Sequence, residues 1–339
     1  MNSQIPELKR TSSIPPSVAP MAANQLQLYQ TGMSKVPFTP ITNPPMLVPI
    51  AIPEGELDHL KFAQPLILHQ NQIVGDYRVT DFLTAGGMAA LFSAQNIMTG
   101  EPCILKIPGD PYRDYHFSEV SALSEMSPSK HIVGFRNAGK IEEMGLDYLV
   151  IEQINGKTLG QIIEEEGRLP LEKALAYIED IVNGLESAQK NGVIHKDLNA
   201  ENVVIREPED KAVLIDFGLS KVKADPNKAP GALIYRAPWQ LMGDTVDHRA
   251  DIYALGILLY KMLTGKLPIE TKGKELLEVY YMKLALYLEL TDRIADPAVQ
   301  NSIEKLINRM TKPALNAPER INSYQEIRDE IRRIRNTLL

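Results

Sequence analysis

The chain of 339 residues has few of the features that mark secreted or membrane-spanning proteins. Its single cysteine, Cys103, cannot form an internal disulfide, which favours a reducing compartment. No stretch reaches the roughly 20 uninterrupted apolar residues that a membrane-spanning helix needs. The N-terminal residues MNSQIPELKR lack the apolar core of a signal peptide. These features predict a cytoplasmic protein without a membrane span, and they leave open its export as an effector.

Positive charge is also scarce. The sequence has 36 Lys and Arg against 43 Asp and Glu, a formal net charge of −7. Because a nucleic-acid backbone binds to basic surfaces, this balance argues against a nucleic-acid partner. The 44% of apolar and 23% of charged residues are typical of a globular protein, and the length suffices for two lobes with their own cores.

Proline is concentrated in the first 65 residues, for example in IPPSVAP and KVPFTPITNPPMLVPIAIP. These stretches show neither helical nor alternating periodicity, so we expect residues 1–65 to be a disordered N-terminal extension. It is interpreted either as a simple tail or linker, or as a docking segment. In the second case MLVPIAIP would bind a groove on a partner or on the same chain.

After residue 65 the pattern changes to short runs rich in β-branched and aromatic residues. Strands are expected at 76–83, 90–95, 102–108 and 147–153, with a further one in VGFRNAGKIEEM and a helix at 117–126. From residue 153 onward helical periodicity dominates, and 250–265 is apolar almost all round, as in a buried helix. The patterns predict an α+β protein with an N-terminal lobe at 66–152 and a mainly helical lobe at 153–339.

Several short motifs contain the groups that phosphoryl transfer requires. These are a Gly-containing loop, a Lys for the phosphates with an acid to hold it, oxygen ligands for Mg²⁺, and an Asp beside the attacking hydroxyl. The motifs LTAGGMAALF (83–92), CILK (103–106), HFSEVSAL (116–123), HKDLNAEN (195–202) and AVLIDFGLS (212–220) supply them in that order. A Gly pair in a hairpin, or a Lys in an apolar strand, would alone be weak evidence.

From about Gly75 to Ile331 the chain resembles the protein kinase family, in which these motifs occur in the same order. The resemblance implies a two-lobed fold whose N-lobe is a five-stranded antiparallel sheet with one helix. It also implies ATP as substrate with Mg²⁺, or alternatively Mn²⁺. Lys106 would hold the phosphates and Glu119 would pair with Lys106.

The resemblance assigns the remaining site residues as well. Asp197 would orient the acceptor hydroxyl and accept its proton, while Asn202 and Asp216 would be the metal ligands. Ile151 would be the gatekeeper. The nucleotide would further contact Leu83, Gly86, Gly87, Leu91, Ile104, the hinge backbone of Glu152 and Ile154, and Val204.

Later motifs distinguish a protein kinase from a small-molecule kinase of the same fold. GALIYRAPWQL (231–241) resembles the segment that binds the substrate peptide. Asp251 matches an acid that, in the family, holds the backbone of the catalytic loop, here HKDLNAEN (195–202). Arg320 matches an arginine that the family carries near the end of the domain. An unidentified protein substrate, with Ser or Thr as acceptor, is therefore favoured. The GGM loop resembles that of bacterial eukaryotic-like kinases.

Four positions depart from the family pattern. Asn199, retained as a candidate catalytic residue, stands where a phosphate-neutralising Lys is usual, and Ala232 stands where a Thr is usual. Trp239 replaces a Glu that pairs with the late arginine, so we expect Arg320 either to find other partners or to be exposed. Ile104 replaces a small Ala above adenine. These departures support the alternative of a pseudokinase, a scaffold with little or no catalysis.

Overall fold

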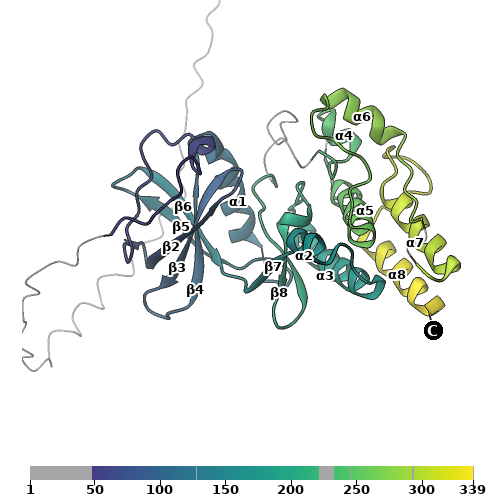
Figure 1. Ribbon diagram of the computed structural model, residues 1–339, viewed down its shortest axis with the longest axis horizontal. Helices are drawn as coiled ribbons and strands as arrows, with labels where there is room; N and C mark the ends of the chain where they lie inside the picture. The colour runs from purple at the N-terminus through teal and green to yellow at the C-terminus, as the bar shows by residue number, and fades with distance from the viewer. Residues whose placement is uncertain (1–47, 127, 221–232, 245, 292–293, 339) are drawn as a thin grey trace, which may run out of the picture. The chain divides into compact units, whose positions relative to one another are not determined.

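The computed structural model describes residues 48–126, 128–220, 233–244, 246–291 and 294–338 (Figure 1). Its strands are β1 Ile73–Val74, β2 Tyr77–Ala85, β3 Ala89–Asn96, β4 Pro102–Pro108, β5 Phe135–Ile141, β6 Leu146–Glu152, β7 Gly156–Thr158, β8 Val203–Arg206 and β9 Lys211–Leu214. Its α-helices are α1 Arg113–Glu125, α2 Leu159–Glu166, α3 Leu171–Lys190, α4 Pro238–Leu241, α5 Arg249–Thr264, α6 Leu276–Leu284, α7 Pro297–Met310 and α8 Tyr324–Leu338. Short 3₁₀ helices are η1 Asp58–Leu60, η2 Asp110–Tyr112 and η3 Ala200–Asn202.

The N-lobe is an antiparallel sheet in the order β1-β2-β3-β4-β6-β5. Alternation along β4 places Cys103, Leu105 and Ile107 in the lobe's core, so Ile104 and Lys106 point from the opposite face. The sheet has six strands rather than the expected five. The additional strand, β1, is only two residues long and lies at the sheet edge, too short to give a periodic signal.

Residues 48–65 differ from the expected disordered extension. The side chains of Ile50 and Leu60 are buried in the N-lobe core. The Ile50 amide donates to the Leu68 carbonyl at 2.8 Å, so this part of MLVPIAIP contacts the N-lobe of its own chain. Its apolar residues follow no regular period because proline and irregular backbone separate them. Residues 1–47 lie outside the described part of the chain.

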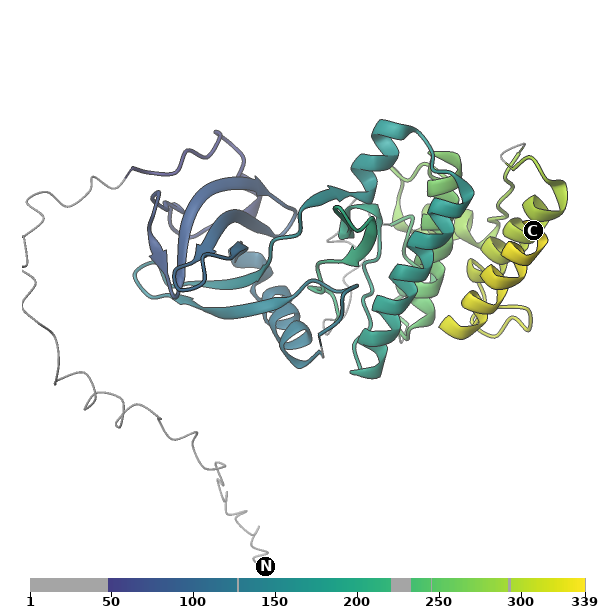
Figure 2. The same cartoon turned by 90° about the horizontal axis from the view of Figure 1, so that it is seen from below.

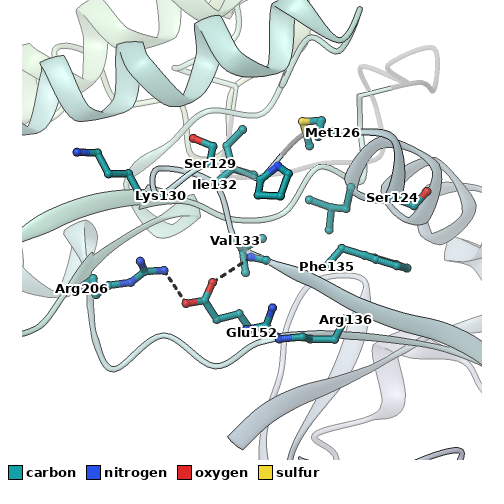
Figure 3. A pocket seen from close by; sticks show the side chains of 13 residues that line it. Ser124, Met126, Ser129, Lys130, Ile132, Val133, Phe135, Arg136, Glu152 and Arg206 are labelled. Carbon is teal, nitrogen blue, oxygen red and sulfur yellow. Dashed lines mark hydrogen bonds and ion pairs between the residues drawn. The ribbon is translucent and has the colours of Figure 1, made fainter. Parts of the chain in front are cut away.

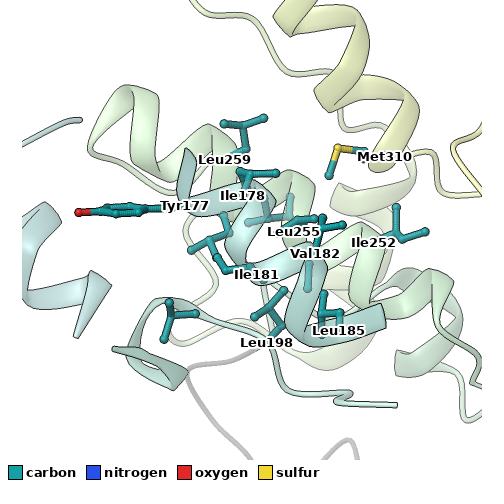
Figure 4. Close-up of a cluster of buried hydrophobic side chains, with 14 of the residues drawn as sticks. Tyr177, Ile178, Ile181, Val182, Leu185, Leu198, Ile252, Leu255, Leu259 and Met310 are labelled. Carbon is teal, nitrogen blue, oxygen red and sulfur yellow. The ribbon is translucent and has the colours of Figure 1, made fainter. Parts of the chain in front are cut away.

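The C-lobe is organised around α5, which is buried on nearly all sides. Helix α3 packs on one side of α5 and α7 on another, and Figure 2 shows α3 and α5 side by side in teal and green. Leu198, from the loop before η3, is inserted among the side chains of α3 and α5 (Figure 4). This buried leucine fixes the loop that contains Asp197 to the rigid helical core.

A small sheet in the order β7-β8-β9 pairs the strand that follows the N-lobe, β7, with two strands that lie between α3 and α4 in the sequence. The Val133 amide donates to the Leu214 carbonyl at 2.9 Å, and the Leu214 amide donates to the His131 carbonyl at the same distance. The connection from α1 to β5 is thereby joined to β9. Among the helices in the described part of the chain, none has the length and apolar character needed to cross a bilayer.

Candidate active site

Lys106 lies between two acids from different parts of the chain. Its Nζ is 2.7 Å from Oε2 of Glu119, on α1, and 3.3 Å from Oδ2 of Asp216, which follows β9. The predicted Lys106–Glu119 ion pair is therefore confirmed. The side chains of Lys106 and Glu119 are 12% and 2% exposed, so the contact is largely shielded from water.

The two acids keep Lys106 charged. Burial alone would lower the pKa of Lys106, but Asp216 and Glu119 outweigh burial and raise it. Burial also works against ionisation of Asp216, yet Lys106 and the Gly218 amide hold the pKa of Asp216 below its usual range. Burial raises the pKa of Glu119 to about 7, with Lys106 opposing the rise. The arrangement concentrates charge where a polyphosphate would bind.

Hydrogen bonds to Asp251, on α5, hold the catalytic loop in place. The Asp251 carboxylate accepts hydrogen bonds from the His195 amide at 2.9 Å and the Lys196 amide at 2.8 Å, as expected. The His195 ring bonds the Ile215 carbonyl at 3.1 Å and packs on Phe217, with the ring centroids 4.6 Å apart. The loop and the Asp216 segment are thus held to one another.

Asp197 stands at the end of this braced loop. Its Oδ2 and its carbonyl both accept from Nδ2 of Asn202, at 3.2 and 2.9 Å. Burial, together with the charge of Asp216, raises the pKa of Asp197 to about 7, while Arg236 opposes the rise. A carboxylate whose pKa lies near neutrality is suited to accept a proton at physiological pH.

Asn199 is turned into the loop rather than toward Lys106 or Asp216. Its Oδ1 accepts from the amides of Glu201 and Asn202, at 2.9 and 3.2 Å, and its Nδ2 donates to the Asp197 carbonyl at 3.0 Å. Asn199 therefore caps η3, and it fixes the backbone on both sides of itself. Ala232, the position with which it was compared, lies outside the described residues.

The two predicted metal ligands, Asn202 and Asp216, lie on neighbouring stretches of backbone. The Ile215 amide donates to the Asn202 carbonyl at 3.0 Å, which links the two predicted metal ligands through the backbone. Asn202 uses its amide nitrogen toward Asp197, so its amide oxygen points away from that residue. Within the described residues no three His, Cys, Asp or Glu side chains form a metal-binding cluster. Two oxygen ligands supplemented by phosphates and water are what Mg²⁺ commonly takes.

The glycine-containing loop is a tight connection between β2 and β3. The Gly86 amide donates to the Ala89 carbonyl at 2.9 Å, and the His59 ring bonds the Gly86 carbonyl at 2.8 Å. Leu83 and Gly87 are exposed beside it, and Leu91 is partly buried. Sequence reasoning missed His59, which comes from η1 in the segment assigned to the extension.

Ile104 shares its strand face with Lys106, and its register partner on β6 is the predicted gatekeeper, Ile151. Val204 is partly exposed on the face of β8 that points away from the C-lobe core. These positions agree with the prediction that both lobes contribute apolar side chains to a surface for the adenine ring.

The side chain of Glu152 is engaged by Arg206 and Gly134. Its Oε1 pairs with Nη2 of Arg206 at 2.7 Å, and its Oε2 accepts from the Gly134 amide at 3.1 Å (Figure 3). These groups line a cavity of about 400 Å³ that Arg136 also borders. Any contact of Glu152 with a nucleotide would therefore come from its backbone, as predicted, and Ile154 follows two residues later.

Trp239 and Arg320 replace the usual ion pair with a stack. The Arg320 guanidinium lies 4.4 Å above the Trp239 ring and also donates to the carbonyls of Lys312 and Arg249. Arg320 is 1% exposed, so it has found other partners, which was one of the two expected outcomes. Burial lowers the pKa of Arg320 to about 10, which still leaves it charged at neutral pH.

Two further residues hold the acceptor segment, which we define as residues 233–241. Gln240 donates through Nε2 to the Lys196 carbonyl at 3.2 Å and accepts from the Ala237 amide at 2.7 Å. Lys283, on α6, donates to the carbonyls of Ile234 and Arg236. Neither role was predicted, because both residues act on backbone groups: Gln240 lies within GALIYRAPWQL, where no role was assigned to it, and Lys283 belongs to no motif.

With this geometry established, comparison with known proteins decides the family. The family model for the protein kinase domain matches residues 77–329. The chain belongs to the protein kinase family. Similar members include a probable serine/threonine-protein kinase of Clostridium acetobutylicum, 28% identical over 275 residues, covering 77% of this chain and 40% of the relative. Another is the serine/threonine-protein kinase PknD of Mycobacterium tuberculosis, 30% identical over 211 residues, covering 59% and 31%.

Comparison with solved structures gives the same assignment for the fold. The kinase domain of Mycobacterium tuberculosis PknI superimposes with a TM-score of 0.61 at 21% identity, covering 79% of this chain and 99% of that domain. At this identity the likeness concerns the fold, which is the predicted two-lobed α+β kinase fold. The chain spans less than half the length of the curated relatives it matches.

Proposed function

We propose that the chain transfers the γ-phosphoryl group of Mg-ATP to a Ser or Thr hydroxyl of a protein substrate. The observation that carries this proposal is the Lys106–Glu119–Asp216 arrangement, with contacts of 2.7 and 3.3 Å. A protein that used the fold only as a scaffold would have no need for a buried lysine held between two acids. The acceptor segment beside Asp197 favours a peptide over a small molecule as substrate.

Each group has a distinct role in the proposed reaction. Asp197 hydrogen-bonds the acceptor hydroxyl and takes its proton as the hydroxyl oxygen bonds to the γ-phosphorus. The bond from that phosphorus to the β–γ bridging oxygen breaks, and ADP leaves with the electron pair. Lys106 neutralises charge on the phosphates, and Glu119 fixes its position. Asn199 acts as a positioning residue, since its side chain holds the carbonyl of Asp197.

The nucleotide and metal sites follow from the same residues. Asn202 and Asp216 would hold Mg²⁺, or Mn²⁺ in its place, which when bound supplies positive charge to the phosphates. The remaining nucleotide contacts are proposed to come from Leu83, Gly86, Gly87, Leu91, Ile104, the backbone of Glu152 and Ile154, and Val204. A cytoplasmic site of action is inferred from the lone, buried Cys103. Partner docking by the residues before 48 stays a prediction.

The test is transfer of labelled phosphate from Mg-ATP to the chain itself and to a basic protein. Wild type is compared with Asp197→Ala and Asp216→Asn, and with Lys190→Met as a control at an exposed lysine on α3. We expect incorporation by wild type and the control only, at serine or threonine. A wild-type protein that binds Mg-ADP but labels no protein would favour the pseudokinase, and small-molecule acceptors would then be screened.

A further inference from the structure

Lys283 is a lysine with no access to solvent. It is 0% exposed, on the inner side of α6, and its Nζ donates to the carbonyls of Ile234 and Arg236 at 2.5 and 2.6 Å. The Tyr253 hydroxyl lies 3.4 Å from the same nitrogen, and the Tyr253 ring centroid lies 4.7 Å away. All three standard donor positions of the amine are thus directed at the acceptor segment or at the helix beneath it.

The site offers Lys283 no compensating acid. Among the described residues it forms no ion pair, and burial lowers its pKa well below the usual range. A buried amine is costly unless its hydrogen bonds are made. The carbonyls it meets belong to buried residues, so an apolar side chain at 283 would leave both of them without this donor. The lysine is explained by what it holds rather than by its charge.

Lys283 holds the part of the acceptor segment that contains Arg236. Arg236 is buried, and its charge acts on Asp197. Four residues later Gln240 bonds the Lys196 carbonyl, one residue before Asp197. The segment is therefore attached to the catalytic loop at Gln240 and to α6 at Lys283.

Aromatic rings extend this attachment. The Trp239 and Tyr253 rings meet edge to face, with their centroids 6.0 Å apart. Arg320 lies over the Trp239 ring and Lys283 over the Tyr253 ring. A buried guanidinium, a buried amine and two rings therefore secure the acceptor segment against α5 and α6, with no carboxylate among the four side chains.

We propose that Lys283 is a positioning residue for the protein substrate, acting through the carbonyls of Ile234 and Arg236. This inference rests on the proposed function, and it names a residue that governs the acceptor side of the reaction. Lys106, Glu119 and Asp216 contact one another, whereas Lys283 contacts the acceptor segment and Tyr253, so nucleotide binding is expected to be independent of Lys283.

The test uses the full chain with Lys283→Met, which keeps an apolar stem, and Lys190→Met as the matched control. We expect kcat/KM for a basic protein substrate to fall by about tenfold or more, as for loss of two buried hydrogen bonds, and the control to match wild type. The dissociation constant for Mg-ADP should stay within about twofold in both variants. Equal loss of nucleotide binding and of substrate phosphorylation would overturn the proposal, because it would show a general loss of structure.

Hydrogen exchange separates this inference from the proposed function. In the nucleotide-free protein, amides of 233–241 should exchange faster in Lys283→Met than in wild type, whether or not the protein phosphorylates anything. Lys283→Gln keeps N–H donors on a side chain one atom shorter and should give an intermediate rate. If Lys283→Met does not fold, the comparison of Lys283→Gln with wild type decides. Identical exchange in 233–241 and identical KM would refute the role of Lys283.

Discussion

The two ends of the active site are built on different principles. At the nucleotide end, Lys106 pairs with Glu119, as the resemblance to the protein kinase family predicts, and it also contacts Asp216. At the acceptor end, Trp239 stands in place of the carboxylate of the family's usual ion pair and stacks on Arg320. Lys283 adds hydrogen bonds to two backbone carbonyls, and no sequence motif predicts these bonds.

The difference follows from what each end must do. Phosphates carry fixed charge, so the groups that neutralise them must be charged and must reach one position. The acceptor segment needs only to be held still, and stacking, backbone hydrogen bonds or an ion pair can all do that. A departure at the acceptor end is therefore weaker evidence against catalysis than a departure at the nucleotide end would be.

The largest expected effect is at the nucleotide end. Lys106→Met should lower kcat/KM for protein phosphorylation by about 10³-fold, equivalent to about 4 kcal/mol of transition-state energy, because the phosphates lose their cation. Radiolabel incorporation measures this, with Lys190→Met as control. Retention of more than a tenth of the activity would mean that Lys106 does not contact the phosphates in the reaction.

At the acceptor end the next largest effect is one of stability. Trp239→Ala should lower the free energy of unfolding by about 3–5 kcal/mol, since it removes a buried ring and leaves Arg320 without its stack. Trp239→Phe keeps a ring face and should cost less. Urea unfolding followed by circular dichroism is required, because Trp239 is the only tryptophan of the chain. Equal losses for both variants would show that the Arg320 stack contributes nothing.

Acid should weaken the nucleotide end through α1. Burial lowers the pKa of His116 to about 4, against about 6.5 in the unfolded chain. The unfolded chain therefore binds the extra proton between pH 6.5 and 4, so stability is fully present above pH 6.5 and is lost as pH falls toward 4. The contribution is at most about 3 kcal/mol.

Chemical unfolding of wild type and His116→Asn across pH 4–7 tests the role of His116. The variant should show a shallower loss of stability below pH 6.5. Other buried groups set the remaining slope: burial lowers the pKa of His195 to about 4, which acts in the same direction as His116, whereas it raises the pKa values of Glu119 and Asp197 to about 7, which acts in the opposite direction. Parallel curves for the two proteins would rule out His116 as a source of the pH dependence.

The smallest expected effect is at Asn199, whose side chain contacts only its own loop. Asn199→Ala should lower the free energy of unfolding by about 1 kcal/mol, the usual cost of losing an N-cap. Phosphorylation should fall by less than tenfold, because the side chain acts on the backbone and not on the phosphates. Asn199→Ser, which can still cap η3, should recover most of the stability. A loss of activity as large as that of Lys106→Met would instead place Asn199 among the catalytic residues.

The sequence predicts the nucleotide end better than the rest. Lys106 and Glu119 are found because the chemistry demands one lysine and one acid in recognisable motifs. Asp251 is found in the same way, and its two amide contacts are confirmed. The roles of these residues in the reaction stay predictions until activity is measured.

The features that the sequence did not predict depend on contacts with backbone groups or lie in segments without regular secondary structure. Lys283 meets carbonyls 47 and 49 residues away, and a carbonyl has no residue signature. Leu60 and His59 lie in a Pro-rich stretch whose apolar residues have no period, so their packing on the N-lobe was not foreseen. Composition detects the proline and not the tertiary contact that overrides it.

The exchange of a carboxylate for an indole at Trp239 changes how the acceptor segment responds to its surroundings. A carboxylate–guanidinium contact is lost when the acid takes up a proton, and salt screens it where solvent reaches it. The Trp239 ring has no proton to gain, and Arg320 keeps its charge at any pH below about 10. The Trp239–Arg320 contact, which links the acceptor segment to the chain before α8, should therefore not weaken in acid and should depend little on ionic strength.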